Sequence, residues 1–341
     1  MSFTETLRGS AGKLRGNAVK PPPDGSRPQP GWRRYWPMYA AVSPFFLLFA
    51  VFGVFPVAFS IYLSFMSWDG IGDMKSIGWE NYEYLVTDPD FWQSIANTLI
   101  IWVLATVPMV FLALVIAYAL HTTVRFKAFY RVAYFVPNVT SIVAMTIVLG
   151  SVFSDSSGLL NSMLRVINAG EVGWLSDPWA MKVSVAAITI WRWLGYNTII
   201  CLAGLQAISS DVYEAARVDG ASNRQTFFRI TIPMLRPVIL FVVITSTIGG
   251  LQLFTEPQVM FPDDSGNVGG PGGEATTIVL YLYQQAFIFN RFGYGAAIGW
   301  ALFILIAAFS IINWRLVAGR SEDATGTGKG KKKGKGRSRA R

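Results

Sequence analysis

Charged side chains are scarce in this 341-residue chain: they make up only 14% of it, whereas 52% of the residues are hydrophobic. A soluble domain carries about 25% charged residues, so the shortage excludes an ordinary soluble protein. The charges are also unevenly spread, because uncharged runs such as 35–68, 91–120 and 132–154 alternate with charged segments. Since about 20 apolar residues can cross a bilayer, the composition predicts a membrane protein with several spans.

Cysteine and histidine occur once each, as Cys201 and His121. A single cysteine excludes an intramolecular disulfide, and a single histidine argues against histidine-rich metal sites and histidine-based catalysis. The chain also lacks the G-x-x-x-x-G-K-[ST] loop that cradles nucleotide phosphates. We therefore expect no catalytic residue, no metal site and no cofactor in this chain, and any ATP would have to bind to another subunit.

The net charge of +9 lies in the two ends of the chain. Residues 1–34 carry +5 and residues 318–341 carry +7, so the segment between them sums to −3. Basic tails of this kind stay solvated and contact anionic lipid headgroups, and they do not form the binding face of a folded domain. We predict a basic cytoplasmic tail over 1–36, a membrane domain over 37–317, a disordered basic tail over 318–341, and no nucleic-acid partner.

The uncharged runs predict an all-α protein with six membrane-spanning helices. The spans are expected near 38–66, 95–120, 132–153, 183–206, 237–256 and 294–316. Both termini and the loops on their side hold 24 Lys and Arg, against 3 in the alternate loops. Because positively charged loops stay in the cytoplasm, both termini are expected there. A further apolar run over 275–290 is too short to span and is predicted as an interfacial or re-entrant helix on the outer side.

The loop between the fourth and fifth predicted spans, residues 207–236, is predicted to form two short helices joined by an elbow. Asp211 is the expected N-cap of the first helix. Gly220 suits the left-handed position at which a helix ends. Ser222 is expected to begin the second helix and Pro233 to end it. A structured element on a cytoplasmic loop indicates a docking surface.

This loop resembles that of the permease subunits of binding-protein-dependent ABC importers, whose pattern is E-A-A, three residues, G, nine residues, I-x-L-P. The chain keeps both spacings and has Ile232 where the pattern has Leu. The Asp-Gly-Ala sequence at 219–221 is similar to that of carbohydrate importers of the maltose-type uptake class. The residues that the resemblance assigns to ATPase coupling are Glu214, Ala215, Ala216, Asp219, Gly220, Ile230 and Pro233.

The resemblance implies a mechanism in which this loop is a coupling helix seated in a groove of a cytoplasmic ATPase. Closure of the ATPase dimer, which holds ATP and Mg, would switch the permease between inward- and outward-facing states. The implied partners are a second homologous permease subunit, two ATPase subunits and an extracytoplasmic sugar-binding protein, in a bacterial cell membrane. A non-sugar solute such as glycerol phosphate is an alternative, and so is an ATPase-independent secondary transporter.

Polar side chains inside spans are costly in hydrocarbon and are therefore candidates for the substrate path. Aromatic faces stack on sugar rings, and Arg or Asn can hydrogen-bond to hydroxyls. The candidates are Trp191, Arg192, Trp193, Tyr196 and Asn197 in the fourth span, and Gln252, Thr255 and Glu256 at the end of the fifth. Alternatively, Arg192 snorkels or pairs within the bundle, and the second cluster is a helix end meeting water. The segment 250–257 also resembles the branch that handles cello-oligosaccharides.

Overall fold

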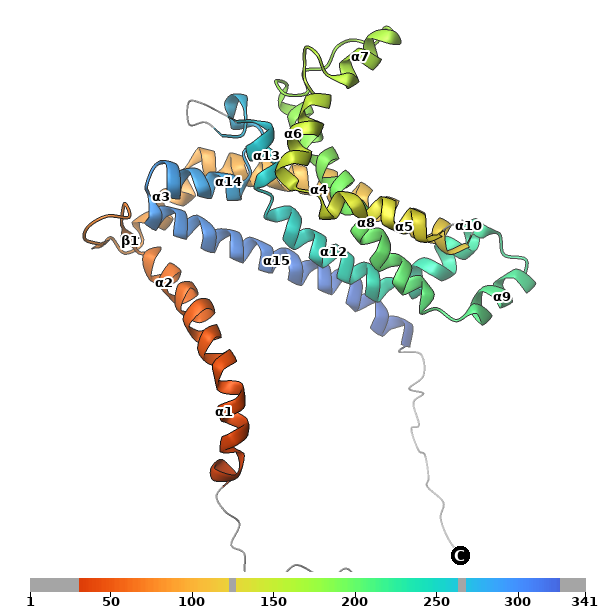
Figure 1. The fold of residues 1–341 in the computed structure, drawn as a ribbon, viewed down its shortest axis with the longest axis horizontal. Helices are drawn as coiled ribbons and strands as arrows, with labels where there is room; N and C mark the ends of the chain where they lie inside the picture. Colours follow the sequence, from red (N-terminus) through yellow and green to blue (C-terminus); the bar gives the residue numbers. More distant parts are fainter. Residues whose placement is uncertain (1–30, 123–126, 263–267, 326–341) are drawn as a thin grey trace, which may run out of the picture. The chain divides into compact units, whose positions relative to one another are not determined.

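The structure is a computed structural model, and it describes residues 31–122, 127–262 and 268–325. Helices dominate these residues (Figure 1). The chain divides into two units, residues 1–59 and 60–341, which are considered separately. Most of the two predicted tails, namely residues 1–30 and 326–341, lies outside the described residues.

The first predicted span corresponds to one nearly continuous helix. It consists of α1 (Gly31–Phe49), a π-helical turn (Ala50–Val54) and α2 (Phe55–Leu63). Its part from 35 to 63 is long and apolar enough to cross a membrane, and its large apolar side chains are mostly exposed. The helix stops three residues before the predicted end because Met66 and Ser67 pair as a strand with Lys75 and Ser76. It also starts at Gly31, inside the predicted tail.

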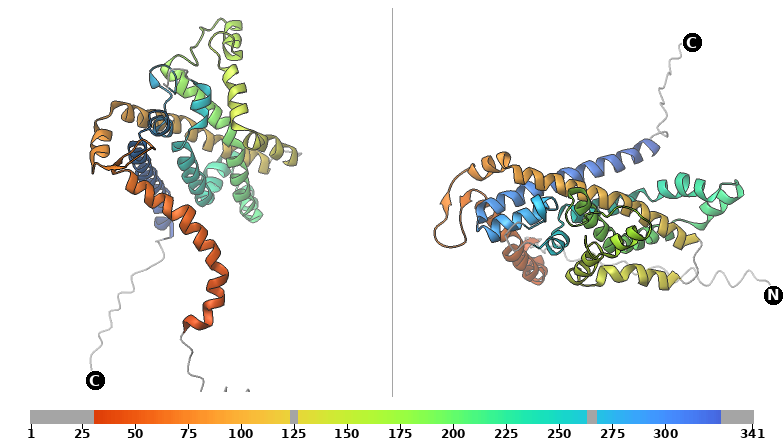
Figure 2. Two further views of the ribbon diagram at one scale, coloured as in Figure 1. Left: turned by 60° about the vertical axis from the view of Figure 1, so that its left-hand side comes forward. Right: turned by 90° about the horizontal axis from the view of Figure 1, so that it is seen from above.

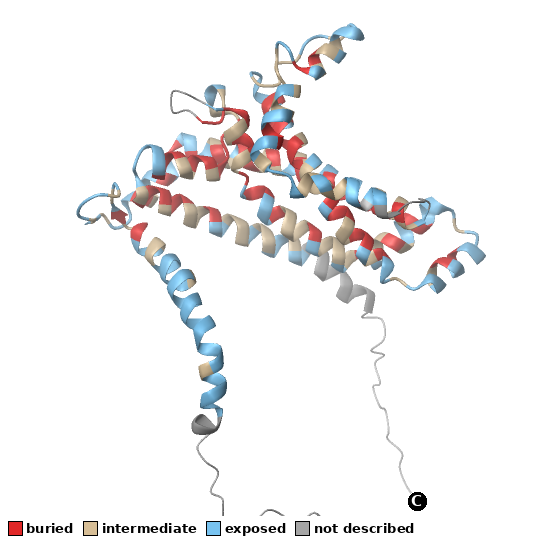
Figure 3. Cartoon of the chain, viewed as in Figure 1, coloured by how far each residue is buried: buried red, intermediate tan, exposed pale blue. Residues whose placement is uncertain are grey.

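Four long helices form the framework of the second unit, and they pack against one another (Figures 1 and 2). They are α4 (Pro89–Thr122), α8 (Pro178–Gln206), α12 (Arg236–Leu251) and α15 (Phe292–Thr325). Helix α4 packs along α8, and α12 lies against both α4 and α15. Figure 3 shows buried residues on all four helices. One buried apolar cluster joins Ala113 and Ala117 of α4 to Cys201 and Leu205 of α8.

Two further membrane segments are bent. The predicted span 132–153 is divided between α5 (Lys127–Val139) and α6 (Ile142–Val152), whose axes differ by 104°. The break occurs because Ser141 leaves the helical conformation and its hydroxyl caps α6 by accepting from the Ala144 N–H. In addition, Pro137 inside α5 lacks the N–H that a helix interior needs.

The second bent segment joins α10 (Asn223–Thr226), a π-helical turn (Phe227–Thr231) and α11 (Ile232–Met234) to α12 at 72°. By length and composition, the described residues contain four straight candidate spans, or six if each bent pair counts as one. Two of the boundaries that differ from the prediction have local causes. Helix α12 ends at Leu251, five residues early, since Gly249 and Gly250 weaken its last turn. Residues 318–325, predicted as disordered, continue α15 because a formed helix propagates easily.

Short elements gather at the ends of the long helices. They are β1 (Met66–Ser67), β2 (Lys75–Ser76), α3 (Glu80–Thr87), α7 (Leu159–Val166), α9 (Ser210–Val218), α13 (Thr255–Met260), a 3-10 turn (Pro271–Gly273), α14 (Ile278–Tyr283) and a π-helical turn (Gln284–Ile288). The elements α3 and α14 mark one end of the unit, and α9 with α10 mark the other (Figure 1). The apolar run 275–290 is indeed a short helix, over 278–288.

A buried carboxylate ties three helices together at the α14 end. Asp88, which directly precedes α4, is 4% exposed and accepts hydrogen bonds from the hydroxyls of Tyr281 on α14 and Tyr294 on α15. The Tyr294 bond is 2.5 Å long. Burial, and next the hydrogen bond to Asp88, raises the pKa of Tyr281 above its ordinary value. The Tyr281 hydroxyl therefore remains a donor to the carboxylate at neutral pH.

The loop over 268–277 is fastened to α4 and α8 at the same end. Gln93 and Asn97 of α4 each donate from their side-chain amide to a backbone carbonyl of this loop, at 2.9 Å. The Lys182 ammonium of α8 lies 2.5 Å from the Glu274 carboxylate of the loop. These bonds hold the loop over 268–277 against α4 and α8.

Candidate functional site

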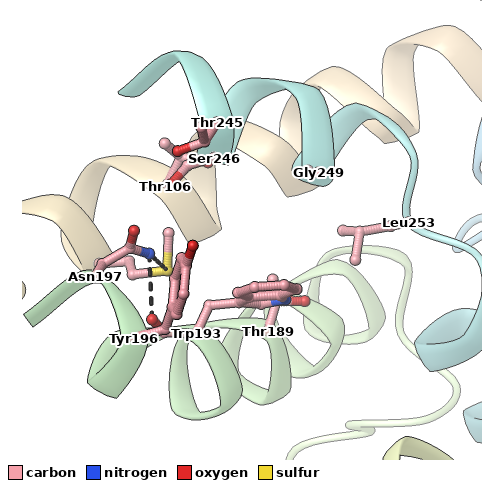
Figure 4. Close-up of a pocket in the computed structure, with 11 residues that line it drawn as sticks. Thr106, Thr189, Trp193, Tyr196, Asn197, Thr245, Ser246, Gly249 and Leu253 are labelled. Carbon is pink, nitrogen blue, oxygen red and sulfur yellow. Dashed lines mark hydrogen bonds between the residues drawn. The ribbon is translucent and has the colours of Figure 1, made fainter. Parts of the chain in front are cut away.

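A small cavity lies between α4, α8 and α12 and is lined without a charged side chain (Figure 4). Its volume is about 60 Å³. The lining residues are Thr106 and Met109 of α4, Thr189, Trp193, Tyr196 and Asn197 of α8, Thr245, Ser246, Gly249 and Gly250 of α12, and Leu253. Ligand pockets usually exceed roughly 300 Å³, so this cavity alone does not enclose a sugar ring.

Three of the lining residues belong to the predicted α8 cluster. Trp193 and Tyr196 meet edge to face with ring centroids 5.8 Å apart. The Asn197 amide donates to the Trp193 carbonyl at 3.2 Å and to the Met109 sulfur at 3.4 Å. The cavity wall therefore combines aromatic surface with hydroxyl and amide groups, which is the chemistry that suits an uncharged polyhydroxylated solute.

Arg192 forms an ion pair within the helical unit. Its guanidinium lies 3.3 Å from the carboxylate of Glu256, on α13, and 5.0 Å from the centre of the Trp193 ring. The side chain of Arg192 is 20% exposed and that of Glu256 only 3%. Of the two alternatives for Arg192, pairing inside the bundle is the one observed. The pair joins two predicted clusters that lie 64 residues apart in the sequence.

The other predicted path residues do not line the cavity. Trp191 is 45% exposed and lies on a different side of α8 from Trp193. Gln252 is exposed between α12 and α13, and Thr255 is half-buried at the start of α13. The second cluster is thus not the end of a continuous fifth helix, and only Glu256 from it contacts the α8 cluster, through Arg192.

The loop over 207–236, called the elbow below, lies at the opposite end of the unit. Its first arm is α9, which ends in a C-terminal cap, and its second arm is the segment from α10 to α11. The Gly220 N–H donates to the Arg217 carbonyl at 3.1 Å, and the Ala221 N–H donates to the Ala216 carbonyl at 2.9 Å. This pair of bonds defines a Schellman cap, with Gly220 at φ +73°. The predicted left-handed conformation of Gly220 is confirmed. The N-cap is Ser209 and not Asp211, because the Ser209 hydroxyl already accepts from the Asp211 N–H.

The second arm of the elbow begins with a reciprocal capping box. Ser222 accepts from the Gln225 N–H at 3.3 Å, and the Gln225 side chain accepts from the Ser222 N–H at 2.8 Å. The predicted end at Pro233 is wrong, since the helical segment continues to Met234. Proline is tolerated there because it lies in the first turn of α11, where its missing N–H costs little.

The predicted coupling residues differ in exposure. Glu214, Ala215, Asp219 and Gly220 are exposed, Ala216 is buried, and Ile230 and Pro233 are half-buried. Val218 on the same helix is 88% exposed. The elbow thus presents small, acidic and apolar side chains on one short projecting segment (Figure 1).

Comparison with known proteins assigns this arrangement to a family. Residues 98–319 match the model of the binding-protein-dependent transport system inner membrane component. The chain belongs to this family. The match covers the whole elbow and all lining residues of the cavity, and its description makes the protein an integral component of a transport system.

Individual relatives agree with the assignment. The permease is 39% identical to the lactose transport system permease protein LacF of Rhizobium radiobacter, over 80% of this chain and 91% of that one. It is 34% identical to the arabinooligosaccharides transport system permease protein AraP of Bacillus subtilis, over 82% and 87%. A solved bacterial alginate ABC transporter in complex with an alginate pentasaccharide-bound periplasmic protein contains a chain that aligns with a TM-score of 0.69. That alignment covers 87% of the permease and 98% of the solved chain at 22% identity, and it shows a shared fold.

Sequence reasoning missed Thr189 of α8 and the cavity residues outside α8. Thr106 of α4 and Thr245 and Ser246 of α12 lie inside apolar runs, where single hydroxyls commonly bond to the helix's own carbonyls, as Thr245 does. These hydroxyl-bearing side chains line one cavity because α4 and α12 pack beside α8, and the sequence alone does not show that packing. The available signal was polarity within a span, which is weak for a hydroxyl.

Proposed function

We propose that this permease forms part of the translocation path for a sugar in an ABC importer and couples it to ATP hydrolysis on a partner subunit. The observation that carries the proposal is the elbow, in which the E-A-A and G positions of the importer pattern lie on an exposed helix and its Schellman cap. The names of the relatives, which transport lactose and arabinooligosaccharides, support a di- or oligosaccharide. A branch specific for cello-oligosaccharides stays a prediction.

The proposed topology has six spans with both termini in the cytoplasm. Counting α5 with α6, and the α10–α11 segment with α12, as one span each gives six. The predicted loops on the side of the termini hold 24 Lys and Arg against 3, which orients the α9 end inward. The α14 end, with Asp88 and the fastened loop over 268–277, then faces outward.

The elbow is the proposed docking site for a cytoplasmic ATPase, which supplies ATP and Mg. Glu214, Ala215, Asp219 and Val218 are exposed, so a groove in the ATPase can cover them without moving the helix bundle. Two ATPase subunits, a second homologous permease and an extracytoplasmic binding protein complete the proposed importer. The small size of the cavity supports the second permease, because a path between two subunits supplies the volume that one subunit lacks.

An uncharged substrate fits the cavity better than glycerol phosphate does. All lining residues are neutral, and the cation nearest to Trp193, Arg192, is already paired with Glu256. The same pairing weakens the alternative of a secondary transporter, since Glu256 is engaged with a cation and not free to bind a coupling ion. The permease is therefore proposed to be a non-catalytic subunit driven by ATP.

Purification from the native membrane tests the proposal. The tagged permease should co-purify in detergent with an ATPase subunit identified by mass spectrometry, and a sugar-loaded binding protein should stimulate ATP hydrolysis. Gly220→Pro should abolish both, because proline cannot adopt φ +73° and lacks the N–H that bonds to Arg217. Gly220→Asn is the matched control, since asparagine tolerates the left-handed conformation and keeps the N–H.

Absence of an ATPase from the wild-type preparation would refute the proposal. Equal ATPase recovery and equal hydrolysis in the proline and asparagine variants would refute the role of the elbow. Thermal unfolding of both variants in detergent checks that the proline acts locally. A local effect is expected because, apart from its chain neighbours, Gly220 has no atom within 4 Å of where its β-carbon would lie.

A further inference from the structure

The last turn of α4 contacts both arms of the elbow. The Tyr118 ring lies 4.9 Å from the ring of Phe227, and its hydroxyl donates to the Asn223 carbonyl at 3.4 Å. The His121 ring lies 5.6 Å from the ring of Tyr213 on α9. Because Tyr118 and His121 are three residues apart, they share one face of α4. The last turn of α4, through Tyr118 and His121, therefore forms a contact surface, called the seat below, for the segments on both sides of Gly220.

These contacts coincide with the parts of the elbow that are buried. Within α9, Tyr213 and Ala216 are the buried residues, whereas the remainder is half-buried or exposed. In the second arm, Phe227 is 7% exposed and belongs to the apolar cluster formed by α4 and α8. Helices as short as these two arms are unstable on their own. Their orientation therefore depends on this seat.

The seat is also connected to the cavity through a single helix. Met109 and Thr106 line the cavity and lie on α4, nine and twelve residues before Tyr118. At 1.5 Å per residue the cavity wall is about 14–18 Å from the seat. Residues of α4 between the two, including Ala113 and Ala117, are fully buried against α8. A displacement of the last turn of α4 is thus carried into the wall of the cavity.

We propose that Tyr118 and His121 are positioning residues that fix the elbow to α4 and transmit its movement to the cavity. The inference rests on the proposed coupling of the elbow to an ATPase. Loss of the seat leaves the elbow able to bind the ATPase but free to move independently of α4. ATP hydrolysis then continues, but fewer sugar molecules are transported for each ATP hydrolysed. Simple misfolding would not produce this result, because it lowers both activities together.

The test uses the complete importer with its partner subunits, reconstituted in liposomes, and measures sugar molecules transported per ATP hydrolysed. His121→Ala removes the ring contact to Tyr213 and should lower this ratio about fivefold, the range expected for one aromatic pair. His121→Phe restores a ring at the same position and should recover most of the wild-type ratio. Phe129→Ala, which removes a ring that is 69% exposed on α5, is the matched control and should leave the ratio unchanged.

Three outcomes overturn the inference. The first is an unchanged ratio in His121→Ala, and the second is a failure of His121→Phe to recover the ratio. The third is a parallel loss of transport and hydrolysis, which would indicate a structural defect. Tyr118→Phe, which removes only the hydroxyl, provides a variant that keeps the packing and should lower the ratio slightly. If the wild-type importer shows no sugar-stimulated hydrolysis, the proposed function fails, which is distinguishable from failure of the seat alone.

Discussion

A methyl group added at Gly195 is expected to force α5 and α8 apart. Gly195 lies on α8, where it packs against the backbone of α5. A β-carbon at this position would lie 1.7 Å from the carbonyl oxygen of Tyr134 and 2.4 Å from its carbonyl carbon. The obstruction is backbone, so no side chain can rotate away. The two helices must separate by more than an ångström before ordinary contact is restored.

The expected cost follows from this geometry. Overpacking of a filled interface costs about 1–3 kcal/mol, and a clash with rigid backbone belongs near the upper end. Replacing a helical glycine with alanine returns about 0.4–1 kcal/mol through the unfolded state. The net loss for Gly195→Ala is therefore about 2 kcal/mol, which for a chain of this length corresponds to a fall in the unfolding midpoint of roughly 3 °C.

Thermal unfolding of the purified permease in detergent, followed by tryptophan fluorescence, measures this change. Gly150→Ala is the matched control: Gly150 also lies inside a helix and, apart from the backbone of that helix, no atom lies within 4 Å of the position that its β-carbon would take. The control should raise the midpoint slightly, so the two substitutions should have opposite signs. A midpoint for Gly195→Ala at or above that of the wild type would refute the close approach of α5 to α8.

Two further substitutions probe buried charge. Glu256→Gln leaves the Arg192 guanidinium without its anion and should destabilise the permease by about 3 kcal/mol, measured by the same unfolding assay. Asp88→Asn replaces the charged acceptor of Tyr281 and Tyr294 with a neutral one and should cost about 2 kcal/mol, detected as faster hydrogen exchange at the start of α4.

Each of these predictions has its own control. Stability should return in part when Arg192→Met is added to Glu256→Gln, because the unpaired charge is then removed. A double variant as unstable as the single one would contradict the pairing. For Asp88, the single variant Tyr281→Phe removes one donor and should cost less than Asp88→Asn. Equal or greater loss in Tyr281→Phe would show that the carboxylate does not join the two tyrosines.

Local sequence signals predicted the elbow well. The left-handed position of Gly220 and the start of the second helix at Ser222 depend on residues close in sequence, so short-range rules suffice. The same rules misplaced the N-cap, because Ser209 and Asp211 are both good caps and only the preceding chain decides between them. The family pattern then suggested the proposed coupling function, which local rules could not supply.

Long-range contacts were not predictable in the same way. Arg192 and Glu256 were both recognised as costly polar groups, but their pairing depends on the break after Leu251 that turns α13 back towards α8. The bend at Ser141 was missed because hydropathy averaged over a span does not register one extended residue, although Pro137, Asn138 and Thr140 interrupt the apolar run just before it. Packing of α4 beside α12 likewise decides which hydroxyls face the cavity.

The hydrogen bonds that hold the loop over 268–277 to α4 determine which substitutions this loop can accept. The amides of Gln93 and Asn97 bind backbone carbonyl oxygens, which every amino acid supplies. Substitutions in the loop therefore leave these two bonds intact wherever the backbone path is kept. The residues that have to be kept are therefore the two α4 amides, the four glycines with positive φ (Gly269, Gly270, Gly272 and Gly273), and Glu274, whose carboxylate pairs with Lys182.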